Sequence, residues 1–190
     1  MKKLLIGCIA LLGTISSSCA ENKTEAVMNN NDNNVLVVYY SATGTTETVA
    51  KEIASATNGK FFKIEPDKEY TSVDLNWNDK TSRSSVEMND MSSRPAIKNG
   101  VVNLDSIETI FIGYPIWWDQ APRVVNTFIE SNKLKGKNVI TFCTSGGSTI
   151  DGSTRTLRET YPDLDIIQGK CLNGASKSEI EKWIKTLGLK

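Results

Sequence analysis

The sequence predicts a three-layer α/β fold, a doubly wound sheet of five parallel strands in the order 2-1-3-4-5 with helices on both faces. Two observations support this. From residue 34 onward, short apolar runs alternate with segments of helical periodicity, the pattern of a parallel sheet with crossover helices. The run "VLVVYY" is apolar throughout, as expected for a strand covered on both faces. A chain of 190 residues is long enough for one such domain.

The five apolar runs set the expected strands. They are Val35–Tyr40, Gly59–Ile64, Thr109–Tyr114, Asn138–Cys143 and Asp165–Gln168. The intervening segments place apolar residues at helical spacing. They predict helices at Thr46–Thr57, Ala121–Ser131, Ile150–Tyr161 and Ser178–Leu187.

The connection between the second and third strands is unusually long. Glu65–Glu108 spans more than forty residues, and such connections are usually functional or disordered. Ser82–Met91 is expected to form the crossover helix. Tyr70–Lys80 is then a long loop at the carboxyl edge of the second strand.

The N-terminus has the layout of an export signal. Lys2 and Lys3 precede an apolar run, Leu4–Ile15, which gives way to small residues. This run is shorter than the ~20 residues that span a bilayer. Residues 1–19 are therefore predicted to be a signal peptide. Cys19 resembles the lipid-bearing cysteine of bacterial lipoproteins, although Ser16 stands where leucine is usual; Ser18-Cys19-Ala20 also fits ordinary cleavage.

Residues 20–34 are polar and rich in asparagine. Such a segment cannot bury enough apolar surface to fold, so it is interpreted as a disordered tether, followed by the domain at 35–190. We therefore expect an exported protein, either anchored to a bacterial membrane through a lipid at Cys19 or free in the periplasm.

Composition excludes several kinds of site. Lysine plus arginine and aspartate plus glutamate each total 22, so nothing favours nucleic acid as a partner. Histidine is absent, which removes the commonest metal ligand and neutral-pH proton shuttle, and no metal site is predicted.

Cys143 and Cys171 remain in the domain. Two buried thiols are favoured over a disulfide bridge between them, and the bridge remains an open alternative.

The stretch "SATGTT", Ser41–Thr46, leaves the first strand and enters the first helix. Backbone amides and the helix dipole favour an anion there. The loop contains no lysine or arginine, and it matches neither a P-loop nor a dinucleotide loop. It suits a phosphate monoester held by neutral donors. The simpler alternative is a turn in which Thr46 caps the helix.

Two further loops lie at the same edge of the predicted sheet. The third strand runs into "GYPIWWDQAP", whose aromatic rings can cover a flat conjugated ring at the switch point. Asp119, in this loop, is expected to begin the third helix. The fourth strand runs into "CTSGGST", which offers backbone amides. This segment lacks the arginine of a phosphatase loop, since Thr149 stands in its place.

Together these segments resemble the flavodoxins, specifically a bacterial branch with "GYPIWW", "TSGGS" and "DLNWND". The resemblance covers the chain from about Asn34 to the end and implies a flavodoxin-like fold with bound FMN. It implies phosphate binding by Ser41, Thr43, Gly44, Thr45 and Thr46. It implies ring binding by Pro115, Ile116, Trp117 and Trp118 and by Ser145, Gly146 and Gly147, with Trp77 and Asn78 closing over the ring or ribityl chain.

The resemblance implies redox chemistry carried by FMN, with no catalytic side chain assigned. Aromatic surroundings with few cations are expected to lower the flavin's potential. The protein is predicted to transfer electrons, or to reduce a small acceptor with NAD(P)H. An exported lipoprotein that holds flavin without turnover, and a domain that has lost its cofactor, are the alternatives. The redox partner is not predicted; the chain is less acidic than electron-carrier flavodoxins.

Overall fold

The computed structural model describes residues 34–189. The predicted signal peptide, all but the last residue of the tether, and Cys19 lie outside these residues. Within the described part of the chain, no helix combines the length and the apolar character needed to cross a membrane.

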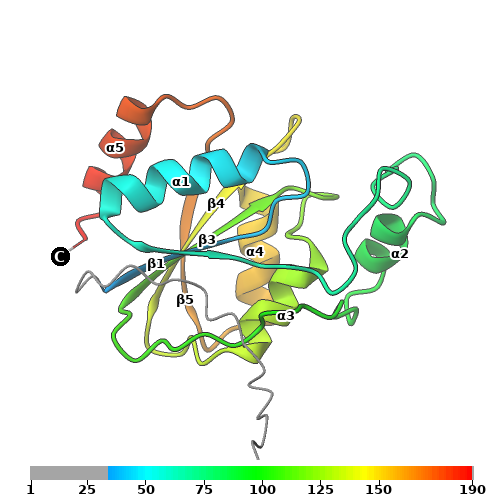
Figure 1. The fold of residues 1–190 in the computed structure, drawn as a ribbon, viewed down its shortest axis with the longest axis horizontal. Helices are drawn as coiled ribbons and strands as arrows, with labels where there is room; N and C mark the ends of the chain where they lie inside the picture. Colours follow the sequence, from blue (N-terminus) through cyan, green and yellow to red (C-terminus); the bar gives the residue numbers. More distant parts are fainter. Residues whose placement is uncertain (1–33, 190) are drawn as a thin grey trace, which may run out of the picture.

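The described residues form a five-stranded sheet in the order β2-β1-β3-β4-β5, with all neighbours parallel (Figure 1). The strands are β1 (Val35–Tyr39), β2 (Lys60–Lys63), β3 (Thr109–Pro115), β4 (Asn138–Thr144) and β5 (Asp165–Cys171). The predicted fold class and strand order are confirmed. β5 runs three residues further than expected, because its last residues continue to pair with β4 beyond a register shift between Ile140 and Phe142.

Helices cover both faces of the sheet. α1 (Thr45–Thr57) and α5 (Lys177–Thr186) lie on one face, where Val49, Ile53 and Ile180 pack with Phe111 and Phe142. α3 (Arg123–Ser131) and α4 (Asp151–Thr160) lie on the other. The central strands are buried on both faces, which explains why their sequences are continuously apolar.

The long connection between β2 and β3 forms a separate projection from the sheet. Pro66 and Ile97 pair in an isolated antiparallel bridge at its base. We call residues 66–97 the arm. It contains one short helix, α2 (Arg83–Asn89), within the expected Ser82–Met91, and the loop before it is a series of turns. Figure 1 shows the arm beside the N-terminal end of α1.

The third helix begins later than predicted. It starts at Arg123 rather than Ala121, with Pro122 as its N-cap. Asp119 does not begin it, since this residue has a φ of 57° and lies in a turn. A left-handed backbone at Trp118 and Asp119 separates the end of β3 from the helix.

Candidate functional site

The loop between β1 and α1 presents an uncapped helix end. Gly44 is the N-cap of α1, with a φ of 90°, and no side chain forms a capping hydrogen bond. Gly44 N donates instead to Ser41 Oγ at 3.0 Å, which folds the loop back on itself. A left-handed φ is easiest for glycine. The first amides of α1 and their dipole are therefore available to an anion.

The hydroxyl groups of this loop have different surroundings. Those of Thr43 and Thr45 lie 3.4 Å apart on an exposed surface. Thr46 is buried, and its Oγ1 lies 2.8 Å from Thr144 Oγ1 at the end of β4. Thr46 is thus not the helix cap; it joins the loop to the carboxyl end of a central strand.

The segment after β3 forms a tight turn. Trp117 and Gln120 exchange backbone hydrogen bonds of 3.0 and 2.9 Å, and the two residues between them both have positive φ. We call residues 117–120 the tryptophan turn. A turn with two left-handed residues is usually built from asparagine and glycine. Two non-glycine residues there store strain, which in proteins is concentrated at functional sites.

The two tryptophans of this turn have different roles. Trp117 packs edge-on against Tyr40 and Tyr70, with ring centroids 5.7 and 5.3 Å away. Trp118 is 43% exposed. Trp117 therefore connects the sheet to the arm, while Trp118 keeps a free face at the edge of the site.

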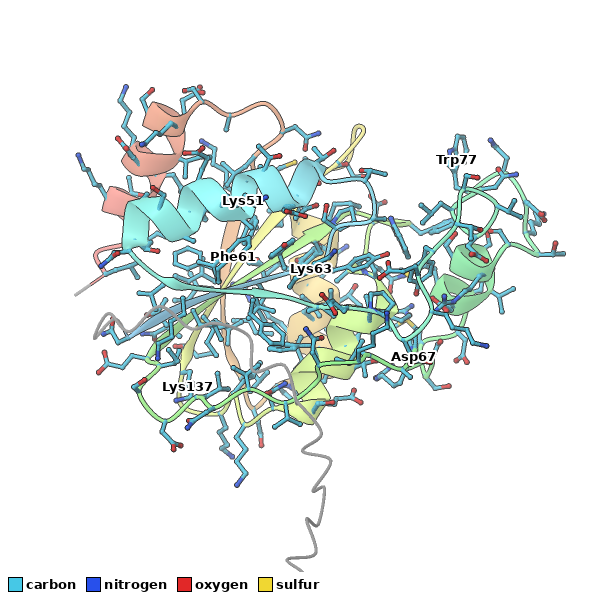
Figure 2. The ribbon with its side chains drawn as sticks, in the orientation of Figure 1. Lys51, Phe61, Lys63, Asp67, Trp77 and Lys137 are labelled. Carbon is cyan, nitrogen blue, oxygen red and sulfur yellow. The ribbon has the colours of Figure 1, made fainter. Side chains whose placement is uncertain are left out.

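These parts enclose a cavity of about 370 Å³, which is in the range of small-molecule sites. The loop after β1, the tryptophan turn and the arm each supply part of the wall. The lining residues are Ser41, Ala42, Thr43, Thr46, Leu75, Trp77, Ser84, Pro115, Ile116, Trp117 and Trp118. One end is polar and faces the α1 N-terminus; the other is aromatic. In Figure 2, Trp77 stands on the outer part of the arm.

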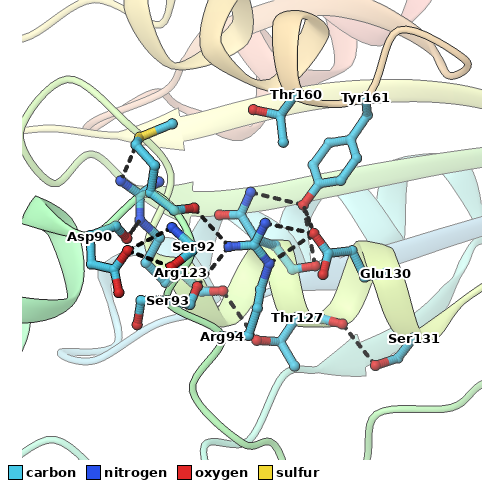
Figure 3. Close-up of polar contacts among 12 residues, drawn as sticks. Asp90, Ser92, Ser93, Arg94, Arg123, Thr127, Glu130, Ser131, Thr160 and Tyr161 are labelled. Carbon is cyan, nitrogen blue, oxygen red and sulfur yellow. Dashed lines mark hydrogen bonds and ion pairs between the residues drawn. The ribbon is translucent and has the colours of Figure 1, made fainter.

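A buried arginine holds the arm in place. Arg123 donates to the carbonyl oxygens of Met88 at 2.9 Å and Asp90 at 3.1 Å, at the carboxyl end of α2. Figure 3 shows the Arg123 side chain beside Asp90. Only 1% of its surface is exposed. Among the described residues, no carboxylate forms an ion pair with it. Burial lowers the pKa of this guanidinium, and the helix carbonyls take the place of a counter-ion.

A second set of contacts supports the arm near the cavity. Tyr70 donates a hydrogen bond to Glu87, which also accepts one from Arg83 at 2.6 Å. The Arg83 guanidinium lies 4.0 Å from the centre of the Tyr70 ring. The cation beside Tyr70 is therefore already paired with a carboxylate.

Comparison with known proteins identifies the family. A family model described as flavodoxin matches residues 34–187.

The chain belongs to the flavodoxin family.

Solved structures agree with this assignment. A protein of Bacteroides uniformis ATCC 8492, assigned as a flavoprotein, is 50% identical, with 80% of this chain and 98% of its own covered and a TM-score of 0.79. A second, from Bacteroides eggerthii DSM 20697, is 51% identical over 82% and 98%, also at 0.79. A Lactobacillus acidophilus NCFM flavoprotein in complex with FMN is 21% identical over 80% and 99%, with a TM-score of 0.62; this likeness shows the fold. Among the curated proteins, none matches this chain.

Most of the residues predicted for a flavodoxin site lie together. Ser41, Thr43 and Thr46 line the cavity with Trp77 and with Pro115–Trp118, while Gly44 and Thr45 lie next to it on the loop. Asn78 and Ser145–Gly147 are not among the lining residues. Ser145 N donates instead to Asn173 Oδ1 at 2.5 Å, and Gly147 N donates to Ser145 Oγ at 3.1 Å.

Sequence reasoning missed three lining residues and two supports of this candidate site. Ala42, Leu75 and Ser84 line the cavity, while Tyr70 and Arg123 hold the arm. Ala42 was within the quoted loop and could have been included. The others depend on how the arm folds back, which no local pattern indicates.

Proposed function

We propose that this chain binds one FMN in the cavity and acts as a redox protein. It would carry electrons between partners or reduce a small acceptor with electrons from NAD(P)H. The observation that carries this proposal is the joining of an uncapped helix N-terminus to an aromatic wall in a single cavity.

The polar end of the cavity fits the phosphate of FMN. The amides at the start of α1 and the hydroxyls of Ser41, Thr43, Thr45 and Thr46 are the donors that would hold it. Hydrogen bonds to a charged acceptor are about twice as strong as neutral ones. A dianion can therefore be held here without a lysine or arginine in the loop.

The aromatic end fits the flat ring system. Trp118 has a free face, and Trp117 is held by Tyr40 and Tyr70. Trp77, on the arm, is 71% exposed and supplies the outer wall. Stacking on aromatic side chains would bury the ring and exclude water from its faces.

The bound FMN would supply the electron transfer itself. In the described chain, none of the residues that line the cavity is an acid or base that titrates near neutral pH. The side chains therefore bind, orient and shield the cofactor rather than move protons.

The direct test is reconstitution of the full chain with FMN. Absorbance and native mass spectrometry should give one FMN for each chain. Anaerobic addition of NADH or NADPH then distinguishes the roles: bleaching followed by recovery with a small oxidant supports a reductase. Bleaching only through a partner reductase supports a carrier.

Two other outcomes would change the conclusion. Stoichiometric FMN that neither donates to nor accepts from any nicotinamide or protein partner would favour a flavin-holding module without turnover. A colourless protein that takes up no FMN would refute the proposal.

The phosphate assignment has its own test. Replacing Thr43 and Thr45 together by valine removes two hydroxyl donors, each contributing ~1.5–3 kcal/mol to a charged acceptor. FMN affinity should fall at least ~100-fold, since 1.4 kcal/mol is tenfold. The matched control, Thr156→Val with Thr160→Val, removes two hydroxyls on α4 that bond their own helix. Equal FMN affinity in the two double variants would contradict the assignment.

We further propose, from the sequence alone, that the protein is exported and anchored through a lipid at Cys19. Cells expressing the full chain should show lipid labelling and membrane association that Cys19→Ser abolishes. An unlabelled protein released into the periplasm would indicate ordinary signal cleavage.

A further inference from the structure

Two cysteines lie side by side in neighbouring strands. Cys143 of β4 and Cys171 of β5 are direct partners in the parallel register, beyond the register shift between these strands. Adjacent strands lie ~4.7–4.9 Å apart, within the ~4.4–6.8 Å between Cα atoms that disulfides span. Direct partners also point to the same face of the sheet, and both cysteines pack in the same core cluster.

The two thiols differ in exposure. Cys143 is completely buried, whereas Cys171 is partly exposed. Burial raises the pKa of the Cys143 thiol, which keeps it protonated and unreactive towards solutes. An external reagent therefore reaches Cys171 first, and Cys143 is accessible mainly to the sulfur beside it.

We propose that Cys143 and Cys171 are a reversible redox pair that closes to a disulfide by exchange with a small disulfide such as oxidised glutathione. Register, shared face and unequal exposure together carry this inference, which goes beyond the flavin site. The thiol–disulfide exchange itself does not depend on bound FMN.

The exchange balances in two steps. The Cys171 thiolate attacks one sulfur of the small disulfide, forming a mixed disulfide and releasing one thiolate. That thiolate takes the proton from Cys143, whose sulfur then attacks Cys171 and releases the second small thiolate, which is protonated by solvent. Two protein thiols are oxidised to one disulfide, and one small disulfide is reduced to two thiols.

The pair is linked to the loop after β4. The Cys171 thiol donates to Asn173 Oδ1 at 3.4 Å. The Asn173 side chain also holds the backbone of Ser145: its Oδ1 accepts from Ser145 N at 2.5 Å, and its Nδ2 donates to Ser145 O at 2.6 Å. Oxidation removes the S–H donor from this clamp. The flavodoxin resemblance implies that Ser145–Gly147 contacts FMN, so oxidation is expected to weaken FMN binding severalfold.

The test uses the full chain incubated with mixtures of reduced and oxidised glutathione, then alkylated in denaturant and digested with trypsin. The sequence places the two cysteines in separate tryptic peptides, residues 138–155 and 171–177. These should appear cross-linked, lighter by two hydrogen atoms, and should separate after reduction. Peptide mapping keeps Cys8 and Cys19 apart from this readout.

Single variants show the order of attack. Cys143→Ser should stop at a glutathione adduct on Cys171, while Cys171→Ser should leave Cys143 as a free thiol. Cys143→Ala replaces the first variant if serine in the core prevents folding. Persistence of both wild-type thiols, or of an unresolved adduct on Cys171, at every glutathione ratio would overturn the proposal.

The link to the cofactor is measured separately, by FMN titration of the reduced and oxidised wild type. Cys171→Ser, which forms neither adduct nor cross-link and keeps a hydroxyl donor beside Asn173, serves as the control whose FMN affinity does not change with oxidant. Equal affinity of the two wild-type forms would overturn the link, and cross-linked peptides without FMN uptake would count against the proposed function alone.

Discussion

Replacing Arg123 by methionine should loosen the arm and weaken the wall of the cavity. Methionine keeps an unbranched apolar stem in the buried site, ends about where the arginine Nε lies, and cannot donate. The carbonyl oxygens of Met88 and Asp90 would lose their donor. Since the arm carries Leu75, Trp77 and Ser84 to the cavity, a loosened arm would lower both the stability of the fold and the affinity for the ligand.

The magnitude follows from the contacts. Hydrogen bonds to a charged group contribute ~1.5–3 kcal/mol each, so the two shorter bonds contribute ~3–6 kcal/mol before desolvation. Removing a buried guanidinium returns part of this, because burying a charge is costly. We expect a net loss of ~2–4 kcal/mol in the free energy of unfolding.

Urea unfolding followed by circular dichroism measures this change, and limited proteolysis locates it. New cleavage should fall within residues 66–97. Lys135→Met is the control, because Lys135 lies outside the arm and pairs with Asp163 at 3.1 Å on the surface, where ion pairs contribute ~0–1 kcal/mol. If Arg123→Met unfolds at the same urea concentration as the wild type and the arm resists protease, the guanidinium does not hold the arm.

Three other perturbations have defined outcomes. In Gly152→Ala, the added Cβ would lie 3.0 Å from the carbonyl oxygen of Asp119, so the tryptophan turn must shift. A fluorescence titration should then show weaker FMN binding, while urea unfolding shows no loss of stability. Unchanged FMN binding would show that the turn does not set the site. In Gly113→Ala, the Cβ would lie 2.0 Å from the Phe142 ring, and thermal unfolding should show a loss of ~1–3 kcal/mol or more from overpacking; the control Gly146→Ala has open space and should match the wild type. Burial raises the pKa of Tyr114 to about 12 from an ordinary ~10. Because the phenol ionises at a lower pH in the unfolded chain, the contribution of this shift to the free energy of unfolding is complete below about pH 10 and is lost as the pH rises towards 12. In urea titrations across this range, the free energy of unfolding should decline less steeply for Tyr114→Phe than for the wild type.

The elements of the fold were predictable because their signals are local. Val35–Tyr39 reads as a buried strand from its own residues, and Val49 and Ile53 mark one face of α1 without reference to any partner. The strand order followed from general rules for doubly wound sheets. Errors occurred at element ends, as at the start of α3, where the tryptophan turn delays the helix.

The candidate site was predictable only in part. Ser41–Thr46 and Pro115–Trp118 follow strands whose carboxyl ends share one edge of the sheet, so topology alone brings them together. Leu75 and Ser84 reach the cavity from the arm, and Arg123, far along the chain, contacts the carboxyl end of the arm's helix α2. The sequence pattern of neither segment indicates such a contact.

The amino-acid order by itself determined the alternation of strands and helices, the hydroxyl-rich loop and its family resemblance, since each depends on residues close together in the chain. Only the tertiary structure decided the left-handed backbone of Trp118 and Asp119, the docking of the arm and the placement of Cys143 beside Cys171 in neighbouring strands. These features depend on strand register and on packing between distant segments, and both are settled only when the whole sheet and its helices fold together.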